Sequence, residues 1–385
     1  MNVYCFDVHS HSKMHLPFNE SYIQIVRSAF PNDQIYFYAE AGHIDNLKIK
    51  FTTDSKVTFG TIDPMVIPFG FSRHNPLLAR IGANKTLNDI SKIIKDKEVR
   101  LVTLMGADSG LYSAVADSWK NISNATIHLL MHAQLGDAMV WRSRNPFIKM
   151  GDYVSQLNKK LSANVKIVAL ELGVKESIIK LAPHLENNII TLEHPVVPAE
   201  CSNNSGRMHQ KIRVGFLGHA NRNKGFDIFC NIAKKCTNSN IEFHAIGIEA
   251  KTEAQPIDTS GLTRKPAKGG LSRREYITAI QEVDIVCSPM YNRCYDFIAS
   301  GTVSDAITHL RPIIGLSNIT LEAIQKKYGQ YGHLFNSAED MLKFFNKLTI
   351  EMLASLNTDW HENLLKIQQR RHPINLGKEF AKLPH

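Results

Sequence analysis

A short stretch near the start of the chain holds residue types that bind metals or move protons. The sequence YCFDVHSHSKMH, residues 4–15, places Asp7, His9, His11 and His15 directly after a short apolar run. His9 and His11 are separated by one residue, and imidazoles are common ligands of zinc. Histidine and aspartate also accept protons in general base catalysis. The stretch therefore indicates either a metal site or a site for a polar substrate, and the rest of the chain must decide between them.

A second group of candidate residues follows an apolar run in the second half of the chain. Residues 213–235, RVGFLGHANRNKGFDIFCNIAKK, are typical of a strand, a loop with Gly218 and Gly225, and a helix. The glycines would let backbone N–H groups approach an anion, and Arg222 and Lys224 would supply positive charge. The stretch favours a diphosphate site, although a strand, a glycine-containing loop and a helix occur together in every α/β protein.

A third group lies in residues 284–315, DIVCSPMYNRCYDFIASGTVSDAITHLRPIIG. Ser300, Gly301 and Thr302 open a helix, where free N–H groups and hydroxyls can bind a phosphate. Asp305 lies one turn into the helix and could accept hydrogen bonds from two ribose hydroxyls. The alternative is structural: Ser300 or Thr302 is an ordinary helix cap, and Asp305 is a first-turn acid favoured by the helix dipole.

The elements that must position these residues form two α/β series. Apolar runs of strand length alternate with amphipathic stretches, which predicts two doubly wound parallel sheets. The polar stretch 198–211 separates them as a linker, so we expect one domain over residues 1–200 and another over 206–357. The tail 358–385 is expected to form basic helices that pack back on the first domain. The expected strands are 3–8, 34–39, 57–61, 100–105, 126–132, 165–170 and 189–192, then 212–217, 241–246, 283–288 and 312–316.

Composition limits the class of protein. The chain has 385 residues, more than the roughly 250 to 300 at which a single core stops growing, which agrees with two domains. The net charge of 45 − 36 = +9 suits an anionic substrate, a nucleotide or an anionic membrane surface. The first residues resemble no signal peptide, and no run of 18 apolar residues occurs. The six cysteines form no Cys-x-x-Cys pair, so we expect reduced thiols in a cytoplasmic protein.

Both stretches of the second half resemble the donor domain of GT-B glycosyltransferases, in particular the retaining, glycogen-synthase-like group with its bacterial polysaccharide and lipopolysaccharide transferases. That group has Gly-Arg-x-x-x-x-Lys-Gly and, later, Glu-Ala-x-x-x-Gly-x-Pro-Val-Ile. This chain has GHANRNKG at 218–225 and DAITHLRPII at 305–314, in a form similar to a divergent subgroup of exopolysaccharide transferases. The resemblance covers residues 212–316 by motif and the remainder by architecture. It implies two Rossmann-like domains that face each other across a cleft.

The resemblance implies roles for individual residues. Lys224 takes the position of the diphosphate-binding lysine, and Asp305 takes that of the ribose-binding acid. His219 stands where the group has its arginine, for which Arg222 would substitute, and Ile298 stands where the group has its first acid. The implied activity is transfer of a sugar from a nucleotide-diphosphate donor, with UDP favoured and GDP as the other candidate. The acceptor would be a glycan or a lipid-linked glycan, and no metal or other cofactor is expected.

Under the resemblance, loops at the carboxyl ends of the first-domain strands contact the acceptor. His132, just after the fifth strand, takes the position of a histidine that lies close to the sugar in this group. His9, His15 and His74 are the other expected acceptor contacts. An inverting reaction would need a base, for which Asp7 or His11 is the candidate, whereas a retaining reaction would need none; the resemblance favours retention.

The alternative function is a metal-dependent hydrolase of the amidohydrolase type, which begins with a His-x-His pair. It would use His9 and His11 with further ligands such as His132 and His194, all on one eight-stranded barrel. The linker and the second α/β series argue against a single barrel.

Basic and aromatic residues are interleaved in residues 141–160, which suits either a solvated helix or an anionic membrane surface. We therefore expect a cytoplasmic protein that can attach peripherally to the inner face of the cell membrane. No nucleic-acid partner is expected, because the modest charge excess comes without a nucleic-acid-binding motif.

Overall fold

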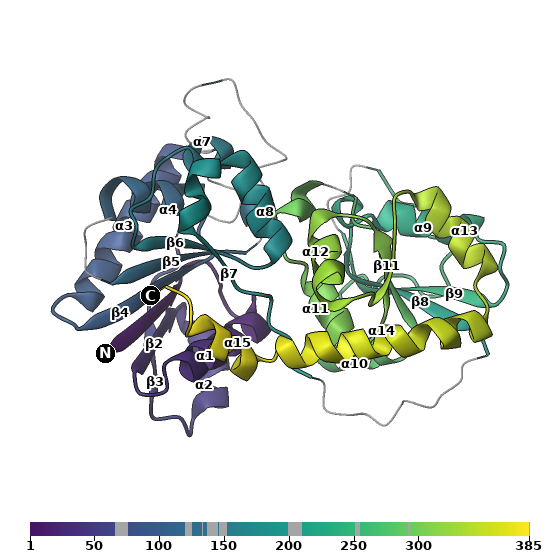
Figure 1. Cartoon of the computed structure of the whole chain (residues 1–385), viewed down its shortest axis with the longest axis horizontal. Helices are drawn as coiled ribbons and strands as arrows, with labels where there is room; N and C mark the ends of the chain where they lie inside the picture. The colour runs from purple at the N-terminus through teal and green to yellow at the C-terminus, as the bar shows by residue number, and fades with distance from the viewer. Residues whose placement is uncertain are drawn as a thin grey trace. The chain divides into compact units, whose positions relative to one another are not determined.

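The structure, a computed structural model, describes residues 1–65, 76–119, 125–132, 134–136, 145, 152–198, 210–250, 255–291 and 293–384. The chain divides into two compact units. The first unit contains Met1–Pro195, Asp296–Ala299 and Pro373–His385, and the second contains Val196–Tyr295 and Ser300–His372. Figure 1 shows each unit as a sheet with helices packed against it. Most of the predicted linker 198–211 lies outside the described residues.

The first unit is built on a seven-stranded sheet in the order β3-β2-β1-β4-β5-β6-β7. Every neighbouring pair of these strands is parallel. The predicted strands of the first half are confirmed, with shifts of at most one residue at their ends. The strands are β1 Asn2–Asp7, β2 Gln34–Ala39, β3 Val57–Thr61, β4 Val99–Met105, β5 Thr126–Met131, β6 Val165–Ala169 and β7 Ile189–Thr191.

Helices cover both faces of this sheet because its strands are apolar on both sides. Tyr4 and Phe6 of β1 belong to one core cluster, and Val3 and Cys5 belong to the other. Figure 1 shows α3 and α4 on one side of the sheet and α1 and α15 on the other. The α-helices are α1 Leu16–Ala29, α2 Ala41–Lys48, α3 Pro76–Ile94, α4 Ser109–Ala114, α7 Tyr153–Leu157, α8 Leu172–Leu181 and α15 Pro373–Phe380, and the shorter turns are Ile49–Phe51, Val115–Trp119, Gln134–Gly136 and Pro183–Asn188.

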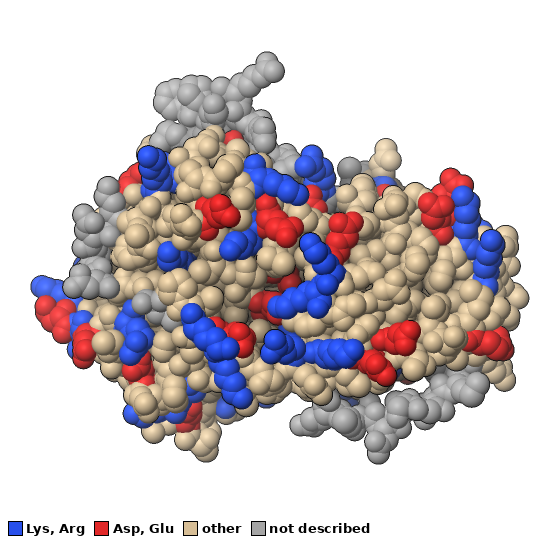
Figure 2. Space-filling view, viewed as in Figure 1, with Lys and Arg blue, Asp and Glu red and all other residues tan. Residues whose placement is uncertain are grey.

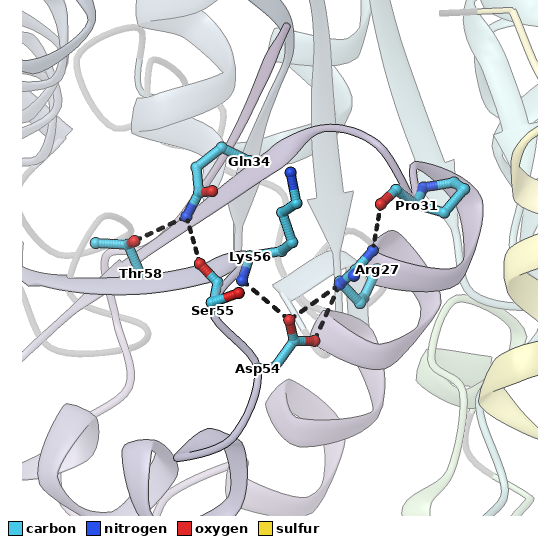
Figure 3. A network of polar contacts seen from close by, with 7 residues as sticks. All are labelled: Arg27, Pro31, Gln34, Asp54, Ser55, Lys56 and Thr58. Carbon is cyan, nitrogen blue, oxygen red and sulfur yellow. Dashed lines mark hydrogen bonds and ion pairs between the residues drawn. The ribbon is translucent and has the colours of Figure 1, made fainter.

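A polar network anchors the edge of this sheet (Figure 3). The Arg27 side chain, at the end of α1, bonds Asp54 Oδ2 at 2.9 Å and the carbonyl of Pro31 at 2.8 Å. Gln34, the first residue of β2, donates to Thr58 Oγ1 of β3 at 2.9 Å. These bonds hold the edge strand β3 and the turn before it against α1 and β2.

The second unit has a five-stranded parallel sheet in the order β12-β11-β10-β8-β9. Its main core packs α9, α13 and the start of α14 against this sheet, with Phe216, Phe229, Phe345 and Trp360 among the largest side chains. The strands are β8 Ile212–Ala220, β9 Ile241–Glu249, β10 Ile285–Ser288, β11 Ile313–Leu316 and β12 Gly332–Phe335. The helices are α9 Phe226–Lys235, α10 Arg273–Gln281, α11 Gly301–Thr308, α12 Ile319–Tyr328, α13 Ala338–Lys347 and α14 Ile350–Arg370, with short turns at Arg222–Lys224 and Arg293–Asp296.

The C-terminal tail differs from the prediction that residues 358–385 pack on the first domain. Residues 358–370 continue α14, which begins at Ile350 and belongs to the second unit. Leu353 and Trp360 are buried in the core of that unit, so the helix is fixed there. Only α15 joins the first unit, where it packs on α1, and Ser28 Oγ donates to the carbonyl of Ile374 at 3.0 Å.

None of the helices in the described part of the chain is long and apolar enough to cross a bilayer.

Candidate functional site

Asp7, the last residue of β1, is buried and accepts hydrogen bonds from the loop that follows and from α1. Its side chain is 3% exposed. It accepts hydrogen bonds from the backbone N–H of His9 at 3.1 Å, from that of Ser10 at 2.9 Å and from Asn19 Nδ2 at 2.5 Å. Burial alone would raise the pKa of Asp7, but the bonds from Ser10, Asn19 and His9 outweigh it and lower that pKa. Asp7 is therefore an ionised carboxylate that orders the loop after β1 and is a weak proton acceptor.

The same loop is held from α2. His43 Nδ1 lies 2.9 Å from the carbonyl of Ser12, and a carbonyl oxygen can only accept, so Nδ1 carries the proton. His43 Nε2 is then the acceptor for Asn19 Nδ2 at 2.8 Å. The Asn19 amide thus gives one hydrogen to His43 and the other to Asp7. Glu40 accepts from the backbone N–H of Ser12 at 3.1 Å. The loop that carries the predicted histidines is consequently rigid at both ends.

Four aromatic rings gather next to this loop. The His132 ring lies 4.7 Å from that of His15, 4.9 Å from that of Phe18 and 5.7 Å from that of His194, measured between ring centroids. Burial lowers the pKa of His132 well below its usual value, and the neighbouring His15 and His194 lower it further. Burial also lowers the pKa of His15. Both imidazoles are therefore neutral at pH 7 and can donate and accept hydrogen bonds to hydroxyls.

His15, Phe18 and His132 border a hollow of ≈ 290 Å³ at the carboxyl ends of β1, β4 and β5. Of the residues predicted for the first domain, the structure brings together Asp7, His9, His15 and His132. His11 is exposed and does not line the hollow. His74 lies outside the described residues. The hollow is lined by Asp7, His9, Ser10, Met14, His15, Phe18, Asn19, Met105, Gly106, Leu130 and His132.

The metal-dependent hydrolase hypothesis finds no support. The described strands form two separate parallel sheets, whereas that hypothesis required one closed eight-stranded barrel. Within the described residues, no three histidine, cysteine or acidic side chains are grouped as metal ligands.

In the second unit, the loop after β8 meets the start of α11. A Cβ built on Gly218 would lie 3.0 Å from Lys224 Nζ and 3.0 Å from Thr302 Cγ2, so these three residues lie in contact around one point. Gly218 has a φ of 88°, a conformation that favours glycine. Asn221 accepts from the backbone N–H of Lys224 at 3.0 Å and fixes the turn. Arg222 points elsewhere: it bonds Asp227 and the carbonyl of Gln255, both at 3.4 Å.

The N-terminus of α11 faces Lys224. Ser300 occupies the N-cap position without capping through its side chain, and its Oγ lies 2.9 Å from Thr302 Oγ1. The first N–H groups of a helix have no partner within it and attract anions. Apart from its chain neighbours and its own helix, no described residue has a heavy atom within 4 Å of a Cβ built on Gly301, so there is space for a ligand beside the helix start. Asp305 falls after the first turn of α11, which removes the structural explanation based on a first-turn acid.

Lys224 and Asp305 perturb one another in this partly enclosed site. Burial lowers the pKa of Lys224, and the nearby charge of Asp305 counters that effect. Burial raises the pKa of Asp305, against the effects of Arg273, Tyr276 and Lys224. Tyr276 donates to Asp305 Oδ2 at 2.9 Å. A half-buried ammonium group gains from an anionic ligand, which would replace the water that it has lost.

Two residues of this site were missed by sequence reasoning. Ser288 ends β10 and is 6% exposed, and its Oγ has no hydrogen-bond partner in the described part of the chain. Its place at the carboxyl end of a central strand was a usable signal. Tyr276 offered no such signal, because only the fold brings it to Asp305. The hollow beside Lys224, of ≈ 210 Å³, is lined by Phe216, Leu217, Lys224, Val286, Cys287, Ser288, Met290 and Thr302.

At the level of sequence, no protein-family model and no curated protein matches the chain. Solved structures do match over nearly its whole length. WaaG, a glycosyltransferase involved in lipopolysaccharide biosynthesis, is 11% identical with a TM-score of 0.62, covering 99% of this chain and 98% of its own. A glycosyltransferase from Rickettsia africae is 13% identical with a TM-score of 0.62, covering 99% and 97%. HepE of Anabaena, solved in complex with UDP, is 11% identical with a TM-score of 0.58, covering 99% of each chain. The chain therefore has the GT-B fold of these glycosyltransferases, with two Rossmann-like units.

Proposed function

We propose that this chain is a glycosyltransferase that moves a sugar from a nucleoside-diphosphate donor to a glycan or a lipid-linked glycan. The observation that carries the proposal is the meeting of Gly218, Lys224 and Thr302 at the N-terminus of α11. That arrangement joins a half-buried cation to a helix start whose first N–H groups can bind an anion, which together suit a diphosphate. The fold supports it, as does the UDP bound to HepE.

The proposed reaction breaks the bond between the anomeric carbon of the donor sugar and the diphosphate oxygen. A new bond joins that carbon to an acceptor oxygen, and the proton of the acceptor hydroxyl passes to the released diphosphate. Lys224 and the start of α11 would stabilise the negative charge that develops on the leaving diphosphate. We propose that they do so without a metal cofactor. Asp305 would accept hydrogen bonds from the ribose of the nucleotide.

In the first unit, we propose that His132 contacts a hydroxyl of the sugar, with His9 and His15 at the acceptor. An inverting transfer needs a base, and Asp7 is poorly suited because three donors occupy its carboxylate and lower its pKa. His11 remains exposed. This arrangement supports retention, which the resemblance to the glycogen-synthase-like group implies. The function of WaaG in lipopolysaccharide biosynthesis supports a cell-surface glycan as the product.

A nucleotide screen tests the donor side of the proposal. Unfolding of the full chain would be followed by differential scanning fluorimetry with UDP, GDP or ADP. A ligand at 100 times its Kd stabilises a protein by about 2.7 kcal/mol, so we expect a shift of several degrees for one of them, with UDP favoured. No shift with any nucleotide at millimolar concentration would contradict the proposal.

Two lysine variants make the screen specific to the site. Lys224→Met should abolish the shift because it removes the cation beside α11. Lys234→Met should retain it, because Lys234 is exposed on α9 and pairs with Asp258. An equal loss of the thermal shift in both variants would mean that nucleotide binding depends only on the net charge of the second unit.

We also propose that the protein works in the cytoplasm, attached peripherally to an anionic membrane that holds its acceptor. The net charge of +9 supports this. On the face drawn in Figure 2, Lys and Arg side chains lie among Asp and Glu side chains on both units, which does not single out a membrane-binding surface. Residues 141–151, which begin the basic and aromatic segment 141–160, lie outside the described residues except for Asn145. Cosedimentation with vesicles that contain phosphatidylglycerol, and not with pure phosphatidylcholine, is the expected result.

A further inference from the structure

Helix α10 reaches Asp305 with two side chains. The Tyr276 hydroxyl donates to Asp305 Oδ2 at 2.9 Å. Arg273 Nη1 lies 3.7 Å from Oδ1, and the Arg273 guanidinium lies over the Tyr276 ring at 5.6 Å from its centroid. The acid of α11 is therefore bound from a neighbouring helix.

The start of α10 is rigid, which fixes the position of Tyr276. Ser272 and Glu275 form a capping box, in which each side chain binds the backbone N–H of the other residue. The backbone N–H of Tyr276 donates to the carbonyl of Ser272 at 2.9 Å, and Ala279 and Ile280 anchor the helix in the interior. A tyrosine in the first turn of such a helix has little freedom to move away from its partner.

The contacts give the two carboxylate oxygens of Asp305 different roles. Oδ2 is taken by the Tyr276 hydroxyl. Oδ1 faces Arg273 at a distance longer than a hydrogen bond, so it keeps the capacity to accept from a ligand. The Asp305 side chain is 24% exposed, so it is partly accessible from solvent. Lys224 is the other charged group that acts on this carboxylate.

We propose that Tyr276 is a positioning residue that holds Asp305 Oδ2, so that Oδ1 accepts hydrogen bonds from the ribose hydroxyls of a nucleoside diphosphate. Arg273 favours the charged form of the carboxylate. The inference rests on the proposed function, because it assigns a specificity contact within the same donor site.

Ribose recognition can be measured apart from nucleotide binding. Isothermal titration calorimetry on the full chain would compare UDP with 2′,3′-dideoxy-UDP, which lacks both hydroxyls, or the guanosine pair if GDP gives the larger thermal shift. Hydrogen bonds to a charged group correspond to roughly tenfold or more in affinity. We expect the chain to bind UDP about tenfold more tightly than the dideoxy compound. Tyr276→Phe should reduce this ratio to about twofold while the affinity for the dideoxy compound stays unchanged.

Variants of two neighbouring arginines, Arg273 and Arg274, provide a matched pair that tests the inference even if Tyr276→Phe does not fold. Arg273→Ala should lower the ratio of the two affinities. Arg274→Ala removes the same charge from an exposed position on the same helix and should leave the ratio unchanged.

The outcomes separate the inference from the proposed function. If Tyr276→Phe lowers the affinities for UDP and for the dideoxy compound by the same factor, the tyrosine has only a structural role and the inference is overturned. A native chain that binds UDP and its dideoxy analogue equally would overturn it too, with the donor site intact. A native chain that binds neither compound would overturn the proposed function and the inference together.

Discussion

Replacing Gly225 by alanine should destabilise the second unit and displace Lys224. Gly225 ends the short turn after β8 and starts α9, with a φ of 77°. A Cβ built there would lie 2.0 Å from the carbonyl oxygen of Pro289, in the segment that follows β10. The turn therefore approaches that segment more closely than any residue with a side chain allows.

The size of the effect follows from two terms. An L-residue in the left-handed region costs about 1–2 kcal/mol. Ordinary van der Waals contact for a Cβ begins at about 3.4 Å, so the turn or the Pro289 peptide must move by about 1.4 Å, which is the difference from 2.0 Å. Overpacking of this kind costs about 1–3 kcal/mol. We expect the free energy of unfolding to fall by about 2–5 kcal/mol.

Urea unfolding followed by tryptophan fluorescence would measure the change, since Trp360 is buried in the core of the second unit. Gly301→Ala is the matched control, because a Cβ there meets no heavy atom of the described residues within 4 Å. Alanine is the better helix former by up to about 1 kcal/mol, so this variant should be as stable as the native chain or slightly more so. A Gly225→Ala protein within about 0.5 kcal/mol of the native one would refute the close approach and the reasoning built on it.

Three further predictions concern the strand ends and one buried histidine. Asp7→Asn should lower the free energy of unfolding at pH 7 by about 1–3 kcal/mol, because the new amide turns a donor toward Asn19. The pKa of Asp7 is lowered on folding, so the difference in urea midpoint between the native chain and this variant should shrink as pH falls through the folded pKa. Ser288→Ala should keep its stability within about 1 kcal/mol yet bind UDP several-fold more weakly by calorimetry, and an unchanged Kd would exclude contact with the ligand. Burial lowers the pKa of His309 to about 4, so between pH 6.5 and 4 the unfolded chain binds a proton at His309 that the folded chain does not bind. Stability should therefore fall as pH falls through this window, and less steeply in His309→Asn; equal slopes in urea titrations would contradict this.

Most strands were predictable because they are buried on both faces, and such strands are continuous apolar runs. The missed strand β12, Gly332–Phe335, is an edge strand of four residues that contains a glycine and a histidine. It pairs with β11 on one side only, so its sequence carries no apolar run to identify it. The sequence also did not predict which unit each C-terminal helix joins, because α14 and α15 are both amphipathic helices. Which core each helix joins depends on shape complementarity rather than on the pattern of either helix.

The candidate site was predictable where one loop or one helix carries it. Gly218 near the end of β8 and Lys224 in the turn that follows are six residues apart, and Ser300 to Thr302 open one helix, so local sequence was enough to group them. The contact between these two groups, and the bond from Tyr276 to Asp305, join segments far apart in the chain. His11 shows the limit of spacing arguments: it lies two residues from His9, yet only His9 faces the hollow.

Asp7 and Asp305 show why residue type at a strand or helix end does not settle a role. Both carboxylates are largely withdrawn from water, and burial alone would raise the pKa of each. Asp7 receives three hydrogen bonds, one of them from Asn19 on the following helix, and its pKa falls. Asp305 receives one from Tyr276, faces two cations, and its pKa stays raised. The Asp7 carboxylate uses its acceptor capacity in hydrogen bonds within the protein. The second keeps an oxygen that can accept from a ligand, so under the proposed function we assign nucleotide specificity to Asp305, whereas Asp7 orders the loop after β1.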